Sequence, residues 1–212
     1  MKQRVRLLTE RHVLLMFVML LLSFTACKKE ESQSEKTPPK AYNPYTAEAV
    51  FDEVRQELQK NPDDVDALFH LADLYERNGQ YAEAIETYKH LTKIKPNAGY
   101  VYFKMGTAYD RLNRPEEAIQ AFKKSVHYMP NHAVAYNNMG IAYGRLNKYQ
   151  EEIAALKKAV QLRPSYSSAR YNLGVTYLKI GNKKAALQEY ESLKKLDEGA
   201  AETLMGEIKK GS

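Results

Sequence analysis

Residues 101–130, "VYFKMGTAYDRLNRPEEAIQAFKKSVHYMP", contain two series of apolar and small residues, each with the spacing of one helical face. The first series comprises Tyr102, Met105, Gly106 and Tyr109, and the second comprises Ala118, Phe122 and Ser125. Between them, Asn113 is suited to the end of a helix and Pro115 to the first turn of the next helix. The stretch therefore predicts two helices joined by a tight turn.

Small residues in this stretch have a packing role. Gly106 and Ala118 lack bulk, so two antiparallel helices can pack at the short end of the usual separation, about 8–10 Å. The large side chains of Tyr109 and Phe122 fill the space beside this contact. One such pair of helices cannot bury its apolar stripe alone, so stacking against further pairs is expected.

The same pattern recurs every 34 residues, in units 65–98, 99–132, 133–166 and 167–200. The repeated positions are Leu71, Met105, Met139 and Leu173; Ala72, Gly106, Gly140 and Gly174; Tyr75, Tyr109, Tyr143 and Tyr177; Ala84, Ala118 and Ala186; and Pro96, Pro130 and Pro164. This pattern resembles the tetratricopeptide repeat over residues 65–200. The resemblance implies an all-α, right-handed α-solenoid of helix-turn-helix units.

The repeats are flanked by two further helical segments. Residues 46–64 are predicted to form a partial leading unit, with a helix over 46–60. Residues 201–212 are expected to hold a capping helix and the C-terminus, because the ends of a solenoid need a polar outer side.

Two residues depart from the repeat. Glu152 stands where the other units have alanine, and a carboxylate at a tight helix contact is costly unless it is paired or reaches solvent. Looser packing of the third unit, or rotation of its second helix, is therefore expected. Glu198 replaces the closing proline of the fourth unit, which predicts that the helix continues there.

The N-terminal 26 residues have the order of a secretory signal peptide. Four basic residues precede the apolar run 13–22, and small residues follow before Cys27, the only cysteine of the chain. The run is shorter than the roughly 20 apolar residues of a membrane-spanning helix. "FTAC" at 24–27 resembles the bacterial lipobox, although leucine is commoner in the place of Phe24. The resemblance implies cleavage before Cys27 and acyl chains on its thiol; an ordinary signal peptide and an uncleaved anchor remain alternatives.

Residues 27–45 are predicted to form a disordered tether, because they are polar, charged and proline-rich. Lys28 follows the cysteine, where aspartate would be an inner-membrane retention signal in some Gram-negative bacteria. We therefore expect an outer-membrane anchor with the folded part in the periplasm.

Composition and motifs argue against several kinds of function. Outside the leader there are 28 basic and 25 acidic residues, a balance that does not suggest nucleic-acid binding. His127 and His132 lack metal-ligand spacing, no phosphate-binding glycine loop occurs, and Gly140 with Gly144 is better explained by helix packing. No enzyme, cofactor, metal or small-molecule substrate is therefore predicted.

The resemblance also implies that the first helices of the units line a concave groove, which commonly binds a peptide or a partner helix. The residues expected to face it are Phe69, His70, Asp73, Arg77, Tyr100, Phe103, Lys104, Thr107, Arg111, Asn137, Asn138, Ile141, Arg145, Tyr171, Asn172, Val175 and Lys179. Asn138 and Asn172 resemble part of an asparagine ladder that holds a peptide backbone. A basic line, formed by Arg77, Arg111, Arg145 and Lys179, either attracts carboxylates or is only solvated.

These features predict a non-catalytic, lipid-anchored adaptor that assembles a bacterial envelope complex through its groove. Outer-membrane insertion, assembly of a pilus or secretin, and a cell-wall enzyme complex are the settings considered, on fold-level analogy. The alternatives are a self-associating structural subunit and a scaffold with an uncleaved N-terminal anchor.

Overall fold

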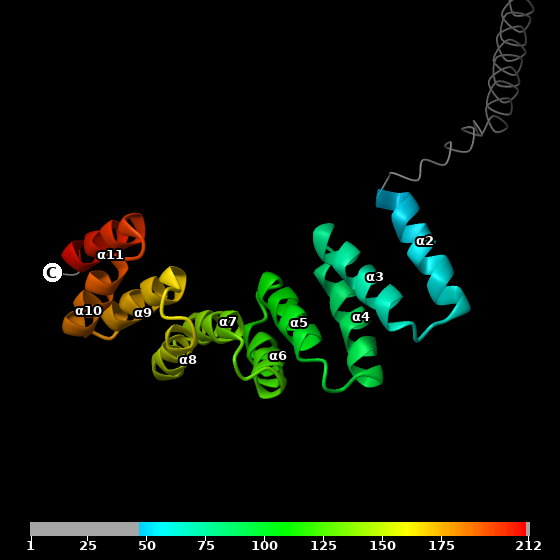
Figure 1. The fold of residues 1–212 in the computed structure, drawn as a ribbon, viewed down its shortest axis with the longest axis horizontal. Coiled ribbons are helices and arrows are strands. Elements are labelled where there is room, and N and C mark those ends of the chain that lie inside the picture. The colour runs from blue at the N-terminus through cyan, green and yellow to red at the C-terminus, as the bar shows by residue number, and fades with distance from the viewer. Residues whose placement is uncertain (1–46, 211–212) are drawn as a thin grey trace, which may run out of the picture. The chain divides into compact units, whose positions relative to one another are not determined.

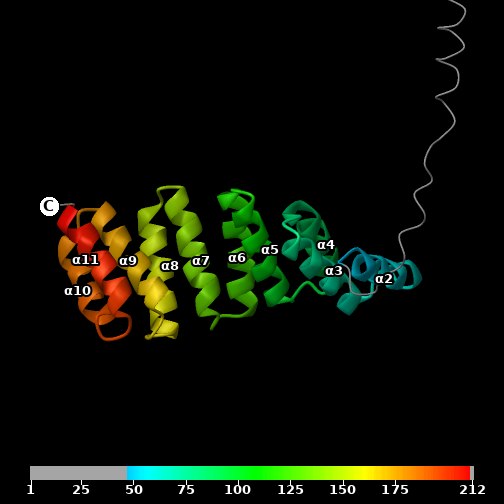
Figure 2. The ribbon, with the colours of Figure 1, turned by 90° about the horizontal axis from the view of Figure 1, so that it is seen from above.

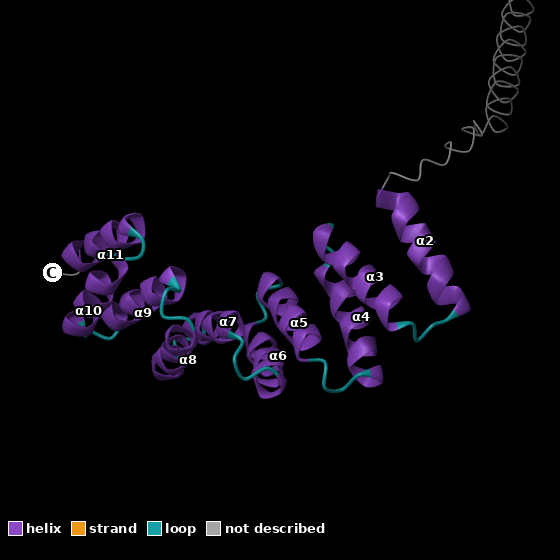
Figure 3. Ribbon diagram, viewed as in Figure 1, coloured by secondary structure: helices purple, strands orange, loops and turns teal. Residues whose placement is uncertain are grey.

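The computed structural model describes residues 47–210, which form α-helices and no strand (Figure 3). The helices are α2 (Ala47–Lys60), α3 (Val65–Arg77), α4 (Tyr81–Ile94), α5 (Gly99–Arg111), α6 (Pro115–Tyr128), α7 (Ala133–Arg145), α8 (Tyr149–Leu162), α9 (Ser167–Lys179), α10 (Lys183–Leu193) and α11 (Glu198–Lys210). The predicted signal peptide, Cys27 and the tether lie outside the described residues. Within 47–210, no helix has the length and apolar character needed to cross a membrane.

The helices pair in chain order and each pair stacks on the next (Figures 1 and 2). The pairs are α3 with α4, α5 with α6, α7 with α8, and α9 with α10. Because each helix contacts mainly its neighbours in the chain, the apolar core runs along the stack. The expected all-α solenoid of helix-turn-helix units is therefore confirmed.

The turn inside every pair uses the same backbone conformation. Gly79, Asn113, Asn147 and Gly181 are 34 residues apart and have φ of 73°, 56°, 56° and 76°. Glycine has no Cβ penalty at positive φ, and asparagine tolerates it better than most residues. In the second unit, Pro115 then begins α6, as its preference for the first helical turn predicts.

Glycines at the equivalent place in the first helices let large side chains of the second helices approach the backbone. A Cβ on Gly106 would lie 2.7 Å from the Phe122 ring, and one on Gly140 would lie 2.9 Å from Cγ of Leu156. Phe122 and Leu156 are fully buried. Unit three therefore packs on the same plan as unit two, so the expectation of a loose or rotated unit three is wrong.

The two ends of the stack are covered by α2 and α11. The ring of Phe51 on α2 lies 5.2 Å from that of Tyr75 on α3. On α11, Leu204 is fully buried, and a Cβ on Gly174 would lie 2.6 Å from its Cδ2. These side chains cover the apolar faces of the terminal units.

The predicted helical continuation at Glu198 is wrong. α10 ends at Leu193, and the main-chain N–H of Asp197 donates to the Leu193 carbonyl at 2.7 Å to form a turn. Oδ1 of Asp197 then accepts from the main-chain N–H of Ala200 at 3.0 Å. An aspartate in this place caps a new helix, and so α11 begins at Glu198.

The first helices of the units lie on the inner side of the curved stack. α7 contacts both α5 and α9, whereas no contact of similar extent joins α4 to α6 or α6 to α8 within residues 47–210. In a curved stack, helices on the inner side lie closer together. We call the exposed side of α3, α5, α7 and α9 the inner face.

Candidate functional site

The structure gives the predicted groove residues different degrees of exposure. Six are exposed: His70, Arg77, Tyr100, Arg111, Arg145 and Lys179. Ten are half-buried: Phe69, Asp73, Phe103, Lys104, Thr107, Asn138, Ile141, Tyr171, Asn172 and Val175. Asn137 is buried. The inner face is therefore partly occupied by contacts within the protein itself.

An aromatic cluster lies at the N-terminal half of the inner face and consists of Phe69, Tyr100, Phe103 and His132. The ring centroid of Tyr100 lies 6.0 Å from that of Phe69 and 5.9 Å from that of Phe103. Phe103 also meets the His132 ring edge-on at 4.7 Å. Tyr100 is 49% exposed, so the cluster presents a large aromatic surface to solvent.

His132 was not among the predicted groove residues, because its place is the turn before α7. Its Nδ1 accepts from the main-chain N–H of Ala135 at 3.2 Å and caps that helix. Burial lowers the pKa of His132, and the charge of Arg163 lowers it further. The neutral ring is therefore favoured, which suits an accepting nitrogen and contact with Phe103.

Charged side chains join α3 to α5 across the inner face. Lys104 pairs with Glu76 and, at 3.4 Å, with Oδ1 of Asp73. Arg77 pairs with the other oxygen of Asp73 at 2.7 Å. Burial lowers the pKa of Lys104, but the two carboxylates outweigh this effect and raise the pKa overall. This network, in which Lys104 is only 18% exposed in its side chain, connects two units.

The contacts between the first helices of the later units are of other kinds. Between α5 and α7, Nη1 of Arg145 lies 3.1 Å from Oδ1 of Asp110 and donates to the Asp110 carbonyl at 3.0 Å. Between α7 and α9, the amide of Asn172 donates to Oδ1 of Asn137 at 3.1 Å, and Asn137 donates to Asn138 at the same distance. The bridge between these units is thus made by Asn137, with Asn138 beside it on the same helix.

The four cations of the basic line have unequal surroundings. Arg77 and Arg145 are paired with aspartates, and the ammonium of Lys179 lies 5.7 Å from the centroid of the Tyr149 ring. Arg111 is exposed and makes no ion pair with any residue in 47–210. It is the member of the line that is most available to an outside carboxylate.

A pocket of about 260 Å³ opens on the inner face between α7, α8 and α9. We call it the Glu152 pocket; its lining is Ile141, Gly144, Arg145, Glu152, Asn172, Val175 and Lys179. Glu152 is 5% exposed, and its Oε2 is buried without a hydrogen-bond partner. Burial raises the pKa of Glu152, against the opposing effects of the Thr176 hydroxyl and the Lys179 ammonium.

Gly144 makes room for this carboxylate. A Cβ on Gly144 would lie 2.6 Å from Oε1 of Glu152, so the carboxylate would have to move to make room for it. The other units have Glu76, Asp110 and Leu178 at the place of Gly144. Two residues of the third unit therefore mark this site in the sequence. One is Gly144, and the other is Glu152, which stands where the other units have alanine.

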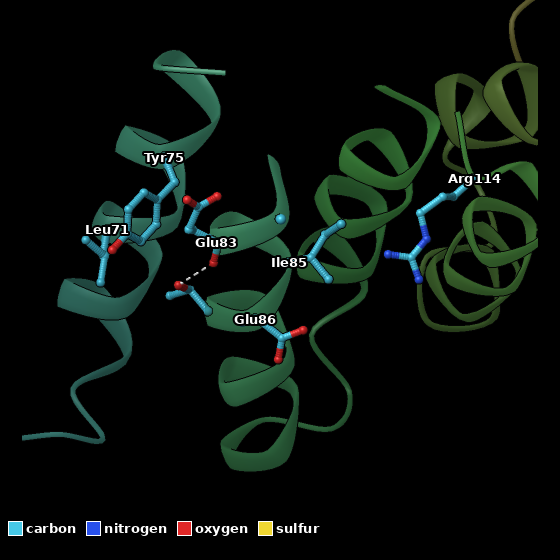
Figure 4. Close-up of a pocket in the computed structure, with 8 residues that line it drawn as sticks. Leu71, Tyr75, Glu83, Ile85, Glu86 and Arg114 are labelled. Atoms are coloured by element: carbon cyan, nitrogen blue, oxygen red, sulfur yellow. Dashed lines mark hydrogen bonds between the residues drawn. The ribbon is translucent and has the colours of Figure 1, made fainter. Parts of the chain in front are cut away.

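A second pocket, of about 430 Å³, lies along α4 between α3 and the turn before α6 (Figure 4). Its lining is Leu71, Tyr75, Ala82, Glu83, Ile85, Glu86, Thr87 and Arg114, none of which was predicted as a groove residue. Arg114 is already held by Glu117, at 2.6 and 2.9 Å. In the part of the chain that the structure describes, no three His, Cys, Asp or Glu side chains are grouped to hold a metal ion.

Comparison with solved structures supports the fold assignment. MamA is 21% identical, with a TM-score of 0.70, 74% of this chain covered and 91% of that chain. YrrB, described as a TPR protein with an unusual peptide-binding site, is 19% identical with a TM-score of 0.67, covering 76% and 84%. PilW, described as a type IV pilus biogenesis factor, is 22% identical with a TM-score of 0.65, covering 78% of each chain.

A comparison with curated proteins finds no match. Family models give a direct result. Models described as tetratricopeptide repeat match residues 41–104, 99–132 and 167–199, and a model described as TPR repeat matches residues 145–181. Together with the 34-residue period and the stacked helix pairs, these matches show that the chain belongs to the tetratricopeptide repeat proteins.

Proposed function

We propose that this protein is a non-catalytic adaptor, anchored to a membrane through acyl chains on Cys27, that binds a segment of a partner protein on its inner face. The observation that carries the proposal is the aromatic cluster. Tyr100 is half exposed on the concave side, with Phe69 and Phe103 beside it. Aromatic side chains of this kind are enriched among the residues that dominate binding energy at protein interfaces.

The rest of the inner face suits a peptide or a helix better than a small molecule. Apolar Ile141 and Val175 alternate with amides and with exposed cations along several helices. A partner segment lying across α3, α5, α7 and α9 would reach all of these groups. Catalytic roles lack support, because the described carboxylates and histidines of this face are engaged in ion pairs, caps and ring contacts, apart from exposed His70 and buried Glu152.

The bacterial envelope is the setting that we propose. The N-terminal pattern of basic residues, an apolar run and "FTAC" supports export and acylation at Cys27. The similar structure PilW is described as a type IV pilus biogenesis factor, and pilus biogenesis is an envelope process. Pilus or secretin assembly, outer-membrane insertion and a cell-wall enzyme complex all meet these constraints.

Affinity capture from envelope extract tests the binding role. The inner-face variant changes Tyr100 and Arg111 to serine, and the matched variant changes Tyr128 and Lys124 on α6 to serine. Both tyrosines are exposed and both contact other rings, so the two variants should be equally folded. Wild type and the α6 variant are expected to capture the same partner, and the inner-face variant is expected to lose it.

Two results would contradict the proposal. Equal capture by all three proteins would show that recognition lies elsewhere than on the inner face. If wild type captures only further copies of this chain, and the inner-face variant captures none, the result would instead favour a self-associating subunit.

A further inference from the structure

The Glu152 pocket contains a carboxylate that the fold does not require. The other three units have Ala84, Ala118 and Ala186 at the same place, and their helices pack without a polar group there. A buried oxygen without a hydrogen-bond partner costs free energy, and Oε2 of Glu152 is such an atom. A partner that donates a hydrogen bond to Oε2 would recover this cost.

The floor of the pocket presents a second free acceptor. The amide nitrogen of Asn172 donates to Asn137, which leaves Oδ1 of Asn172 available to an outside donor. The Thr176 hydroxyl lies near Glu152 and donates to the main-chain carbonyl of Asn172 at 2.7 Å, while Oε2 of Glu152 keeps no hydrogen-bond partner. The floor therefore offers two oxygens that need donors, beside the second N–H of the Asn172 amide.

The rim of the pocket has the opposite character. Arg145 uses Nη1 for Asp110 and keeps other N–H groups free, and Lys179 is exposed beside the aromatic ring of Tyr149. The aliphatic side chains of Ile141 and Val175 also line the pocket. A matching group must therefore accept at the rim, donate at the floor and have a short apolar stem.

These requirements discriminate between the side chains of a partner. A lysine or arginine head would share the pocket with the cations of Arg145 and Lys179, and a carboxylate would share it with Glu152. A carboxamide satisfies both levels, because its NH₂ donates to the floor while its oxygen accepts from the rim. The cavity, about 260 Å³, is smaller than the roughly 300–1,000 Å³ of small-molecule sites, which suits a single side chain.

We propose that the Glu152 pocket binds the carboxamide side chain of a glutamine or asparagine in the partner segment. The inference rests on the proposed function, since it places one residue of the segment that the inner face binds. The methylene groups of the bound side chain contact Ile141 and Val175. Its amide continues the hydrogen-bonded row that Asn137 and Asn172 begin.

The test uses full-length protein in detergent and immobilised short peptides with randomised sequence around one fixed central residue. The central residue is glutamine, asparagine, leucine, lysine or glutamate. Peptides with a central glutamine or asparagine should be retained about tenfold more than the others, because only they form the additional hydrogen bond to the charged Glu152 side chain. Glu152→Ala should lose this preference, and Glu151→Ala, a change at the exposed neighbour on α8, should keep it.

A second measurement does not depend on any variant. The carboxyl carbon of Glu152 in wild-type protein should change its NMR chemical shift when the glutamine peptides are added, and not when the leucine peptides are added. Retention that ignores the central residue, or a preference for lysine or glutamate, would overturn the inference while leaving peptide binding intact. Retention of no peptide at all would overturn the proposed function and this inference together.

Discussion

The carboxylate of Glu152 occupies the space that a side chain on Gly144 would fill. A Cβ on Gly144 would lie 2.6 Å from Oε1 and 2.7 Å from Oε2. The two residues are on neighbouring antiparallel helices, α7 and α8, and each departs from the pattern of the other three units. They therefore form one feature, in which the loss of a side chain on the inner helix allows an acidic group to reach the inner face from the outer helix.

Gly144→Ala should destabilise the wild-type protein, because the added methyl group collides with the carboxylate. Because the carboxylate is the end of a flexible side chain beside a pocket, it can move aside, and the cost should lie at the low end of the range of about 1–3 kcal/mol for overpacking. In a Glu152→Ala background the same change should stabilise by about 0.5–1 kcal/mol, since alanine is favoured over glycine inside a helix. The four proteins form a double-mutant cycle that urea unfolding can measure. Equal effects of Gly144→Ala on the free energy of unfolding in both backgrounds would show that Gly144 and Glu152 do not interact.

Glu152 should make the protein less stable as the pH rises. Burial raises its pKa in the folded state above the unfolded value of about 4.3, so the folded protein holds this proton to a higher pH. Stability therefore falls as the pH increases from about 4.3 through the raised pKa. The free energy of unfolding of Glu152→Ala, relative to wild type, should increase over this window and then become constant. A difference that does not change between about pH 4 and pH 8 would contradict the assignment.

Lys104 should stabilise the junction between the first two units. Lys104→Met keeps the apolar stem and leaves Asp73 and Glu76 without this partner, which should cost about 1–3 kcal/mol. Arg111→Ala removes an exposed cation from the same helix and should change stability by less than about 0.5 kcal/mol. Urea unfolding of the two variants makes the comparison. Equal, small effects would show that the network does not hold the units together.

Cys27 should carry the membrane anchor. Protein purified from a bacterial host should have a mass that lacks residues 1–26 and includes acyl chains. Cys27→Ser should abolish both changes and release the protein from the membrane fraction, because several buried acyl chains are needed for durable anchoring. Cleavage without acylation would indicate an ordinary signal peptide, and retention of residues 1–26 in wild type would indicate an uncleaved anchor.

Most of the fold could be predicted because its determinants are local and recur. Tyr75, Tyr109, Tyr143 and Tyr177 mark the same helical face in each unit, and Asn113 and Pro115 mark the turn between helices. In the structure Asn113 indeed has positive φ, and Pro115 begins α6. The break before Glu198 could not be predicted from the missing proline, because the turn is made by Asp197 and the carbonyl of Leu193.

The contacts of the inner face could not be predicted from the sequence in the same way. Lys104 and Glu76 meet only because the stack brings successive first helices together, and rotamers decide which partners are reached. The ladder residue was expected at Asn138, yet the buried amide of Asn137 makes the bridge to Asn172. Glu152 departs from the repeat in the sequence. How its carboxylate packs, however, depends on Gly144, which lies on a different helix.

The most direct test of the adaptor function is site-specific photo-crosslinking in cells of the native host. A photoreactive phenylalanine analogue replaces Tyr100 in one strain and Tyr128 in another, since both residues are exposed and lie on α5 and α6 of the same unit. A discrete crosslink to one envelope protein is expected from position 100, and none is expected from position 128. The same crosslink from position 128, or crosslinks from neither position, would contradict binding on the inner face.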